Sequence, residues 1–329
     1  MQKKWKYIGG RLGYMMLVMW FIVTMIFLMF RLMPGDPTAA YIDPNWTKDE
    51  QQELRKQFGL DKPLWHQYGI YMGNLCVGEF GMSFHYRKPV LEIIGKVFSN
   101  SIYLMGSSLL LAYLIGVTGG MLLAWNRGTM FEKGGIIVTL LIRSAPHFWL
   151  GMVALAIFAF KLQWFPSTGA SSPGVTYVSE WAKLMSFDFW HHLFLPCITL
   201  TLYMFGLPLL LMRSNMMDVM GEAYVDMARM RGLSEFRVMF KYAARNAALP
   251  VVTAMALGVG YTLGGNVVIE NVFGWPGLGR ILVKAVAASD YPLAQGAFLL
   301  IAALMVFMNF LADIFYSYLD PRVSFGSGR

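Results

Sequence analysis

Charged residues are scarce in this chain of 329 residues: 14% are Asp, Glu, Lys or Arg, while 57% are hydrophobic. Ordinary soluble domains carry about 25% charged residues, which form much of their water-facing shell. So small a charged fraction does not suit a soluble core of this apolar content. The composition therefore argues against an ordinary soluble enzyme and favours a protein whose solvent is partly lipid.

Cysteine is almost missing, with Cys76 and Cys197 the two examples. The sequence has no CxxC motif and no Cys/His cluster, so we predict neither a metal site nor a disulfide framework. Cys197 lies in an apolar segment, where we interpret it as a small buried hydrophobic residue.

Two further absences concern nucleotides and nucleic acids. No GxxxxGK[ST] phosphate loop occurs, and the Gly-rich "GWPGLGR" at 274–280 lacks the Lys-Ser/Thr pair. We therefore expect any ATP hydrolysis to come from another chain. The net charge is +8, but the basic residues form no stripe with interleaved aromatics and no nucleic-acid motif appears. We therefore expect no nucleic-acid partner.

Long apolar runs are what the chain does have. A membrane helix needs about 20 such residues. Six segments meet this length, and we predict six transmembrane helices at 12–32, 101–125, 135–160, 193–212, 249–269 and 293–318. The first run is too long for a signal peptide and no small-residue cleavage site follows it, so we expect a retained anchor.

Basic residues predict the orientation of these spans. Six spans place four segments on one side: the N-terminal tail, the 126–133 loop, the 213–248 loop and the C-terminal tail. Together they carry 14 Lys and Arg residues, against four in the opposite loops 161–192 and 270–292. Positive charge concentrates in cytoplasmic loops. We therefore predict that both termini and the 213–248 loop are cytoplasmic.

The predicted organisation has four parts. Residues 1–32 form the cytoplasmic N-terminus and first span, and 33–100 form an extracytoplasmic region that includes a solvated helix at 47–60, "TKDEQQELRKQFGL". A transmembrane core with helices 2–6 occupies 97–318, including a loop at 214–248, and 319–329 is a cytoplasmic tail.

The charged stretch 222–248 predicts two helices separated at Gly232. Gly suits the left-handed position after a helix, Leu233 can seal that end, and Ser234 suits the N-cap of the next helix. In the second helix, one apolar stripe is expected at Phe236, Met239, Phe240, Ala243, Ala244 and Ala247, with Arg237, Lys241 and Arg245 on another face. Such a unit either lies beside acidic lipid headgroups or docks a partner, and physics alone leaves both open.

The chain resembles the B-type permease subunit of dipeptide and oligopeptide ABC importers, a type I ABC transporter family with an EAA loop. Motifs along nearly its whole length carry the resemblance: "RLMPGDP", "FGLDKPLWHQY", "GEFGMSF", "SAPHFWLG", "WFPSTG", "EAYVDMARMRGLSEFRVMFKYAARNAALPVVT", "ENVFGWPGLGR", "DYPLAQG" and "YLDPRVSF". One departure is that the Leu-Pro closing the EAA pattern lies further away, at Leu249–Pro250.

This resemblance implies an all-α polytopic fold of the type I importer class in the bacterial plasma (inner) membrane. It implies four protein partners: a homologous second permease, two cytoplasmic ABC ATPases and an extracytoplasmic substrate-binding protein. No cofactor is expected in this chain, and ATP and Mg would bind the partner ATPases. The implied ATPase-coupling residues are Glu222, Ala223, Asp226, Ala228, Arg229, Arg231, Gly232, Leu233 and Ser234.

Polar residues in or near the spans are candidates for the pore or its gate: Arg143, His147, Tyr261, Asn266 and Asp313. A charge within a span is a functional candidate by default. For Arg143 the alternative is snorkelling toward the cytoplasmic edge. For Asp313 the alternatives are a charge partner on a neighbouring span or simple solvation at the membrane interface. Pro146 is expected to kink the third span.

The predicted function is import of di- or oligopeptides by an ATP-driven, binding-protein-dependent system in which this chain is a permease and no enzyme. Alternatives are another solute, such as a nickel complex, glutathione or an oligosaccharide. Two further alternatives are a stand-alone secondary transporter or channel, for which no inverted repeat is visible, and a membrane receptor or scaffold.

Overall fold

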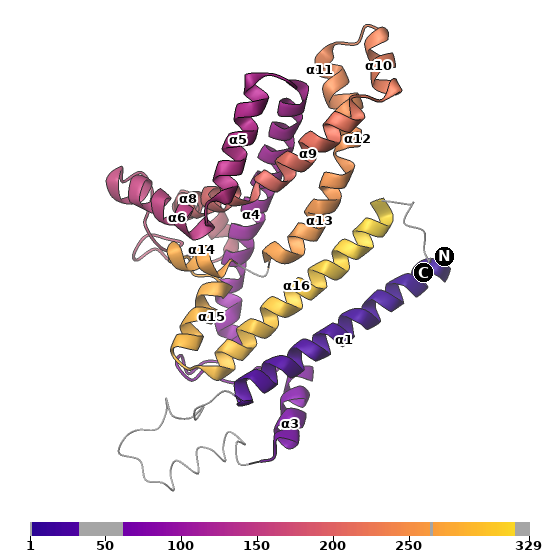
Figure 1. The fold of residues 1–329 in the computed structure, drawn as a ribbon. Coiled ribbons are helices and arrows are strands. Elements are labelled where there is room, and N and C mark those ends of the chain that lie inside the picture. The colour runs from indigo at the N-terminus through magenta and orange to yellow at the C-terminus, as the bar shows by residue number, and fades with distance from the viewer. Residues whose placement is uncertain (1, 33–61, 264–265, 320–329) are drawn as a thin grey trace.

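The computed structural model describes residues 2–32, 62–263 and 266–319, which are helical apart from loops and one isolated β-bridge between Met82 and Pro89. Figure 1 shows long helices with α10 and α11 at one end of the molecule and α3 and α15 toward the other. The predicted helix at 47–60 lies outside the described residues. The helical elements are α1 (Gln2–Leu32), α3 (Leu64–Cys76), α4 (Val90–Trp125), α5 (Met130–Ser144), α6 (His147–Ala154), η2 (Leu155–Lys161), α7 (Glu180–Leu184), α8 (Phe187–Met204), α9 (Gly206–Val219), α10 (Ala223–Met230), α11 (Glu235–Arg237), η3 (Val238–Ala243), α12 (Ala244–Ala247), α13 (Leu249–Leu263), α14 (Val267–Val272), α15 (Leu278–Ala287) and α16 (Tyr291–Leu319).

Within the described ranges, three helices are long and apolar enough to cross a bilayer: Ile8–Leu32 of α1, all of α4, and Tyr291–Ile314 of α16. The number rises to five if each of two bent helix pairs is one span. The described residues are therefore essentially all-helical, with three to five candidate spans against the six that were predicted. The second predicted span, 101–125, lies within α4, which begins earlier, at Val90.

The third predicted span, 135–160, is not one straight helix. After α5 ends at Ser144, the helical stretch His147–Lys161 runs at 96° to it. Pro146 explains the break: it has no N–H to donate, and it drives Ala145 into an extended conformation with ψ 135°. The kink at Pro146 is confirmed, and its size replaces the expected continuous span by a sharp corner.

The fourth and fifth predicted spans are also interrupted. Helices α8 and α9 meet at Phe205 with a bend of 42°. Helix α13 has 15 residues, fewer than the roughly 20 that a straight crossing requires. Residues 249–269 therefore do not form the single helix that was predicted, because α14 begins separately at Val267.

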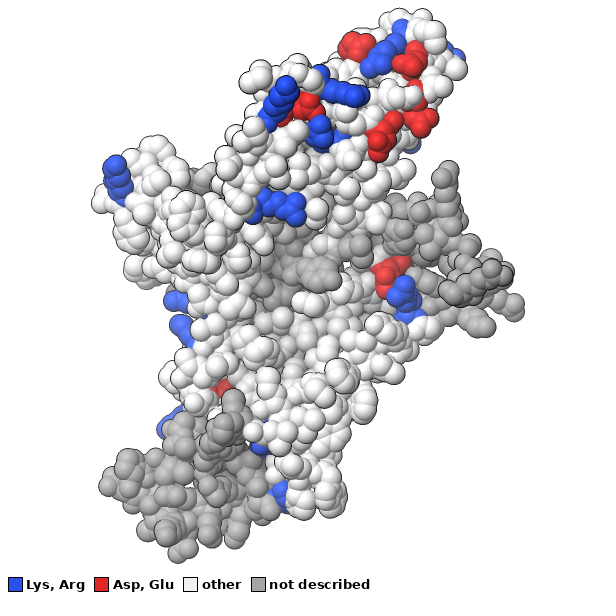
Figure 2. All heavy atoms as spheres, in the orientation of Figure 1, with Lys and Arg blue, Asp and Glu red and all other residues white. Residues whose placement is uncertain are grey.

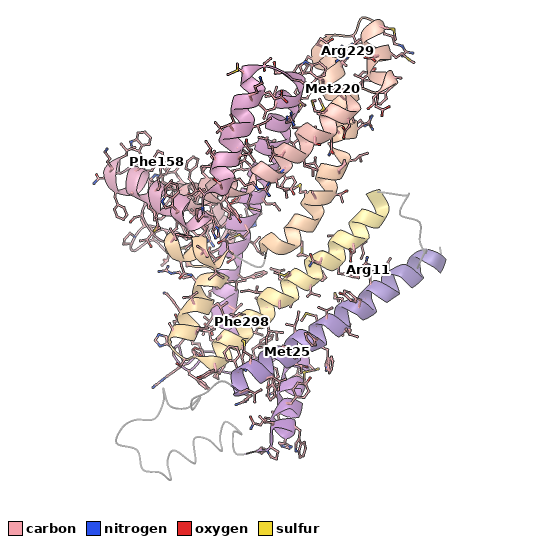
Figure 3. The ribbon with its side chains drawn as sticks, in the orientation of Figure 1. Arg11, Met25, Phe158, Met220, Arg229 and Phe298 are labelled. Carbon is pink, nitrogen blue, oxygen red and sulfur yellow. The ribbon has the colours of Figure 1, made fainter. Side chains whose placement is uncertain are left out.

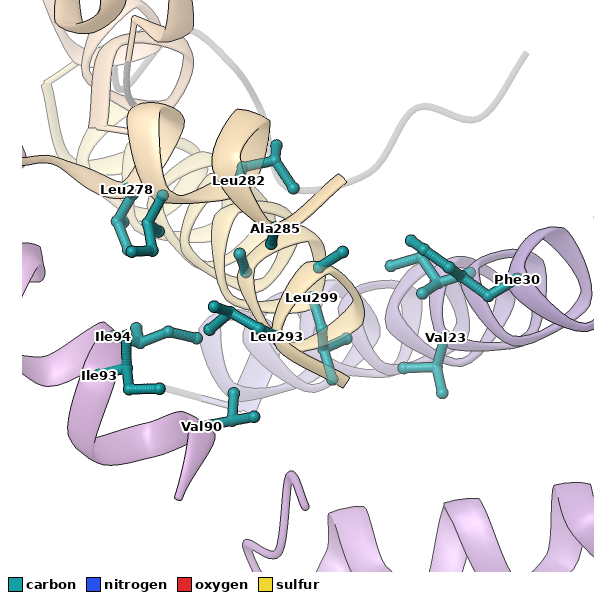
Figure 4. Packing of buried hydrophobic residues seen from close by; sticks show 14 residues of the cluster. Val23, Phe30, Val90, Ile93, Ile94, Leu278, Leu282, Ala285, Leu293 and Leu299 are labelled. Atoms are coloured by element: carbon teal, nitrogen blue, oxygen red, sulfur yellow. The ribbon is translucent and has the colours of Figure 1, made fainter. Parts of the chain in front are cut away.

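Helix α4 packs closely against α9 because small residues line the contact. A Cβ atom added to Gly116 would lie 2.7 Å from Cγ of Pro208, and one added to Gly120 would lie 2.9 Å from Cβ of Met212. Small residues of this kind let membrane helices approach until backbones touch. A second core, drawn in Figure 4, joins α1, α4, α15 and α16 through buried residues that include Val23, Phe30, Ile94, Leu278 and Leu293.

Two buried carboxylates connect distant segments at the end of the molecule that holds α14 and α15. Glu270 accepts hydrogen bonds from Oγ of Ser101 (2.6 Å) and from the backbone N–H of Arg280 (3.0 Å). Asp290 accepts one from Ser83 Oγ and another from the backbone N–H of His85. Both residues are fully buried. These bonds join α14 to α4 and to the first turn of α15, and they join the start of α16 to the segment that precedes α4.

Charged side chains are distributed unevenly. Figure 2 shows most visible Lys, Arg, Asp and Glu side chains over the end where α10 and α11 lie, with sparse charge along the middle. A middle with sparse charge beside a densely charged end is typical of a protein that spans a bilayer.

Candidate functional site

The turn between α10 and α11 has the geometry that its sequence predicts. Gly232 has φ +72°, in the left-handed region. Its N–H donates to the carbonyl of Arg229 (2.8 Å), and the N–H of Leu233 donates to that of Ala228 (3.4 Å). This pair of bonds is a Schellman motif, which satisfies the last carbonyls of α10 and reverses the chain. Ser234 occupies the N-cap position of α11, but its side chain makes no capping bond.

Arg229 contacts three side chains that hold the turn in place. Its guanidinium lies 3.3 Å from the carboxylate of Asp226 and 3.6 Å from that of Glu235. It also lies 5.5 Å from the ring centroid of Trp125, the last residue of α4. Figure 3 places Arg229 at the end of the molecule formed by these elements. The turn is therefore tied to the longest described helix in the chain, a contact that sequence alone did not reveal.

Buried residues beneath the turn join it to the spans. Val225, Ala228 and Val238 pack into one apolar cluster with Met212 and Met216 of α9. All five are nearly inaccessible to solvent. A displacement of α10 would consequently push on α9 and α4, because a close-packed cluster transmits strain.

The predicted apolar stripe of the second helix is wrong at two positions. Met239, Ala243 and Ala247 are buried as expected, whereas Phe236 is 69% exposed and Phe240 is 42% exposed. The cause is the π-helical segment η3, whose wider turns shift the inward face so that Val238 enters the core. Phe236 and Phe240 instead contact each other, with ring centroids 4.4 Å apart.

The exposed surface of the turn combines apolar and basic side chains. Met227 and Met230 of α10 are exposed together with Phe236 and Phe240. Around them, Glu222, Ala223, Asp226, Arg231, Gly232 and Ser234 are exposed, Arg229 and Leu233 are half-buried, and Ala228 is buried. We call the residues 222–240 of this unit the coupling turn. The exposure of Met227, Met230, Phe236 and Phe240 was not predicted, since hydrophobic residues normally predict burial.

The pore candidates lie in different surroundings. The side chain of Arg143 is exposed at the last turn of α5, and its stem packs beside Gly206, where an added Cβ would lie 3.3 Å from Cδ of Arg143. The ring of His147 lies 4.8 Å from that of Tyr203. Arg143 and His147 thus flank the break between α8 and α9. Sequence reasoning missed Tyr203, an aromatic hydroxyl two residues before that break.

Of the remaining candidates, Asn266 and Asp313 have identified neighbours. Asn266 caps α14, since its side-chain oxygen accepts from the N–H of Ile269 at 3.0 Å. Asp313 forms an ion pair with Arg11 of α1 at 3.0 Å, the neighbouring-span partner anticipated as an alternative. Tyr261 lies on α13, and its side chain is outside the described part of the structure.

The described residues contain no group of three or more His, Cys, Asp and Glu side chains that could hold a metal ion. On the coupling turn itself, the exposed side chains are mainly apolar and charged.

Comparison with known proteins identifies the family. A model of "Binding-protein-dependent transport system inner membrane component" matches residues 116–325, and a model of the N-terminal part of such components matches residues 5–105. The chain is 36% identical over 305 residues to a provisionally named peptide permease protein of Brucella suis biovar 1, covering 92% of this chain and 93% of that protein. It is 33% identical over 319 residues to the glutathione transport system permease protein of Escherichia coli strain K12, covering 97% and 99%.

These matches have direct consequences. The protein is a multi-pass inner membrane permease and is not itself catalytic; it has no cofactor of its own, and ATP binds partner ATPases. The family description further implies ATPase and binding-protein partners. The chain therefore belongs to the family of inner membrane permease components of binding-protein-dependent ABC importers.

Proposed function

We propose that this permease imports di- and oligopeptides, forms half of a translocation pore with a homologous second permease, and is driven by two cytoplasmic ATPases through the coupling turn. The observation that carries the proposal is the exposed Met227, Met230 and Phe236 surface on a turn held rigidly by Gly232 and Arg229. Exposed apolar patches rimmed by polar residues mark protein interaction sites.

The coupling residues divide into two roles. Gly232, Leu233 and Ala228 shape the turn through the Schellman bonds, while Arg229 fastens it to Asp226, Glu235 and Trp125. Glu222, Ala223, Asp226, Arg231 and Ser234 are exposed and form the rim that the ATPase would contact. The alternative is a basic loop that lies beside acidic lipid headgroups. Attraction of basic side chains to lipid does not by itself require a turn of fixed geometry.

The mechanism follows from this arrangement. A substrate-binding protein delivers the solute to the extracytoplasmic face, and ATP-driven closure of the ATPases turns the spans outward. Hydrolysis then resets the pore. The buried contacts of Val225, Ala228 and Val238 with α9 would carry the displacement from the coupling turn into the membrane.

The orientation proposed from charge places both termini and the coupling turn in the cytoplasm. Arg213, Arg231 and Arg237 lie at or near that end, and positive charge is retained on the cytoplasmic side. In this topology the region 33–100 is extracytoplasmic. The core 97–318 is transmembrane with its loop 214–248 in the cytoplasm, and the tail 319–329 is cytoplasmic.

Arg143 is proposed as a residue of the translocation path. Its stem lies beside Gly206 on the face of α5 that also contains buried Thr139, which argues against simple snorkelling into lipid. Interrupted helices near the membrane centre are common at transport sites. Arg143, His147 and Tyr203 together would present polar groups there.

The peptide assignment rests on the similar permeases, whose names refer to peptides and to glutathione. Glutathione is itself a short peptide, so the proposal covers both. Nickel complexes and oligosaccharides are less well supported, because none of the similar proteins described above is named for them.

Reconstitution tests the proposal. The permease, its second permease, two ATPases and its binding protein are placed in liposomes, and peptide uptake is measured with ATP and with a non-hydrolysable ATP analogue. Uptake is expected only with ATP. Uptake that persists without the ATPase chains would identify a stand-alone transporter, and binding without uptake would identify a receptor or scaffold. Mass spectrometry of the ligand that co-purifies with the binding protein identifies the solute.

A further inference from the structure

Helix α5 begins with a buried carboxylate. The side chain of Glu132, in the first turn of α5, is only 7% exposed. Its Oε2 accepts a hydrogen bond from the backbone N–H of Gly128 at 2.7 Å, while its own backbone N–H donates to the hydroxyl of Thr129 at 3.3 Å. This arrangement is close to a capping box, in which two polar side chains satisfy the free N–H groups at a helix start. The carboxylate of Glu132 is therefore held in one orientation by the connection between α4 and α5.

The second oxygen of this carboxylate binds α9. Oε1 of Glu132 accepts one hydrogen bond from Nε of Arg213 at 2.9 Å and another from a terminal nitrogen of the same guanidinium. Charge-assisted hydrogen bonds are stronger than neutral ones, and the rigid guanidinium fixes their direction. The two residues lie 81 positions apart in the chain, and their ion pair joins the start of α5 to the middle of α9.

Mainly apolar contacts hold the rest of α5. Ile136 and Ile142 pack against buried residues of α4 and α9, while Leu141 on another face is 64% exposed. The hydrophobic effect is non-directional, so this packing restrains sliding of α5 along α9 less than a bond of fixed direction does. Within the described residues, the pair of Glu132 and Arg213 is the one ion pair that joins α5 to another helix.

Arg213 lies on the helix that supports the coupling turn. The buried Met212 and Met216 of α9 pack against Val225 and Val238 of the coupling turn. Successive residues of an α-helix project about 100° apart, so Arg213 leaves α9 on the face that adjoins the face of Met212. One face of α9 thus meets the coupling turn, and the adjoining face meets α5 through the ion pair.

We propose that Arg213 and Glu132 are positioning residues that pass the ATP-driven displacement of the coupling turn from α9 to α5, and so to the bend at Pro146. The inference rests on the proposed function, because it assumes that the ATPases move the coupling turn, and it deepens that function by naming the route into α5. This helix has 15 residues, so its first turn lies about 20 Å from the bend. Arg143 and His147, proposed for the translocation path, lie on either side of the bend.

Melting temperature measures the structural part of this role. Removing one partner of a buried ion pair leaves a charge uncompensated, whereas replacing both partners by uncharged residues is often neutral for stability. We expect Arg213→Met to lower the melting temperature in detergent by about 5 °C or more. The double variant, Arg213→Met with Glu132→Gln, keeps an acceptor for the Gly128 N–H and should return to within about 2 °C of the unmodified chain.

Movement is measured by pulsed electron paramagnetic resonance in the full transporter complex in lipid nanodiscs. One spin label is placed on α16 at Phe307→Cys and the other on α9 at Ser214→Cys or on α5 at Leu141→Cys, three exposed positions, and the exposed Cys76 is replaced by Ser. Distances are compared without nucleotide and with ATP plus vanadate, so no peptide is required. In the unmodified chain both distances should change. In the double variant the α9 distance should change as before, but the change at α5 should be at least about threefold smaller.

Glu92→Met with Lys96→Met is the matched control, because it removes an ion pair that lies within α4. Both distances should change in it as they do in the unmodified chain. Glu132→Gln alone removes the charge but keeps the shape and an acceptor for Gly128, and it should reduce the change at α5 about twofold. This single variant tests the inference even where the double variant does not assemble.

Three outcomes would overturn the inference: an α5 distance that does not change in the unmodified complex, a full α5 change in the double variant, or a full α5 change in Glu132→Gln. A full change in the double variant together with recovered stability would assign the ion pair a structural role alone. ATP-dependent uptake of tri-alanine by the unmodified complex tests the proposed function separately. Absence of uptake with the α5 movement intact would contradict the peptide substrate and leave the route through the ion pair supported.

Discussion

The two ends of this permease differ in which side chains they bury and which they expose. At the end with α14 and α15, Glu270 and Asp290 are fully buried and are satisfied by hydroxyls and backbone N–H groups of the same chain. At the coupling turn, Met230 and Phe236 are exposed beside basic residues. The buried carboxylates of one end are thus satisfied within the chain, whereas the other end exposes large apolar side chains.

The two ends should therefore contribute to different free energies, one to folding of the chain and the other to association with a partner. A buried carboxylate that loses its donors destabilises the fold directly, because a charged acceptor without a partner is costly. An exposed apolar side chain contributes little to the fold of its own chain but contributes to an interface when it is covered. Substitutions at the two ends should consequently change different measurements.

Loss of the Glu270 carboxylate should have the largest effect. Glu270→Ala removes the acceptor of Ser101 and of the Arg280 N–H, so we expect the free energy of unfolding to fall by about 3 kcal/mol. Thermal denaturation in detergent measures this change. Glu92→Ala is the control, since Glu92 forms only an exposed pair with Lys96 and should change stability by less than about 0.5 kcal/mol. Equal losses of stability in Glu270→Ala and Glu92→Ala would contradict the expected difference between a buried and an exposed carboxylate.

Met230→Asp should weaken assembly without unfolding the chain. Met230 is 80% exposed, so we expect affinity for the ATPase to drop by about 2 kcal/mol, roughly 30-fold, at unchanged melting temperature. Binding of the purified ATPase is the measurement. Met185→Asp is matched in exposure at 78% but lies just after α7, away from the coupling turn, and should leave affinity unchanged. If Met230→Asp binds the ATPase with unchanged affinity, the coupling turn is not the docking surface.

Gly232→Val should uncouple ATP hydrolysis from uptake. An added Cβ meets no atom within 4 Å, so the penalty is the left-handed φ of +72°, about 1–2 kcal/mol for an L-residue. We expect uptake per ATP hydrolysed to fall about tenfold, and Gly232→Asn to retain more activity because Asn tolerates this conformation. Gly221→Val is the control at a neighbouring exposed glycine without positive φ. Normal uptake and normal assembly in Gly232→Val would refute the coupling role.

The ion pair between Arg11 and Asp313 should give the smallest effect. Its side chains are 40% and 30% exposed, so we expect a coupling energy of about 0.5 kcal/mol between Arg11→Gln and Asp313→Asn. A double-mutant cycle on thermal stability measures it. Strict additivity of the two substitutions would mean that the pair does not hold α1 against α16.

Local chemistry explains why the coupling turn was predictable. Gly232, Leu233 and the helices around them follow from backbone preferences within a few residues, and the Schellman bonds confirm that prediction. The exposure of Phe236 and Phe240 was not predictable, because it follows from the π-helical segment η3, which places Val238 instead of these rings in the core. The bend at Pro146 was predictable in part. Proline predicts a kink, but packing against neighbouring helices decides its angle of 96°.

The sequence by itself determined that this is an all-helical membrane protein, that a charged helical turn interrupts its apolar segments, and that it resembles peptide-importer permeases. Those properties depend on composition, on spacing along the chain and on short-range conformational preference. Only the tertiary structure decided that Arg229 reaches Trp125, that Glu270 accepts from Ser101, and that Arg213 donates to Glu132. Each of these joins residues far apart in the chain, and such proximity results from helix packing, which no local pattern encodes.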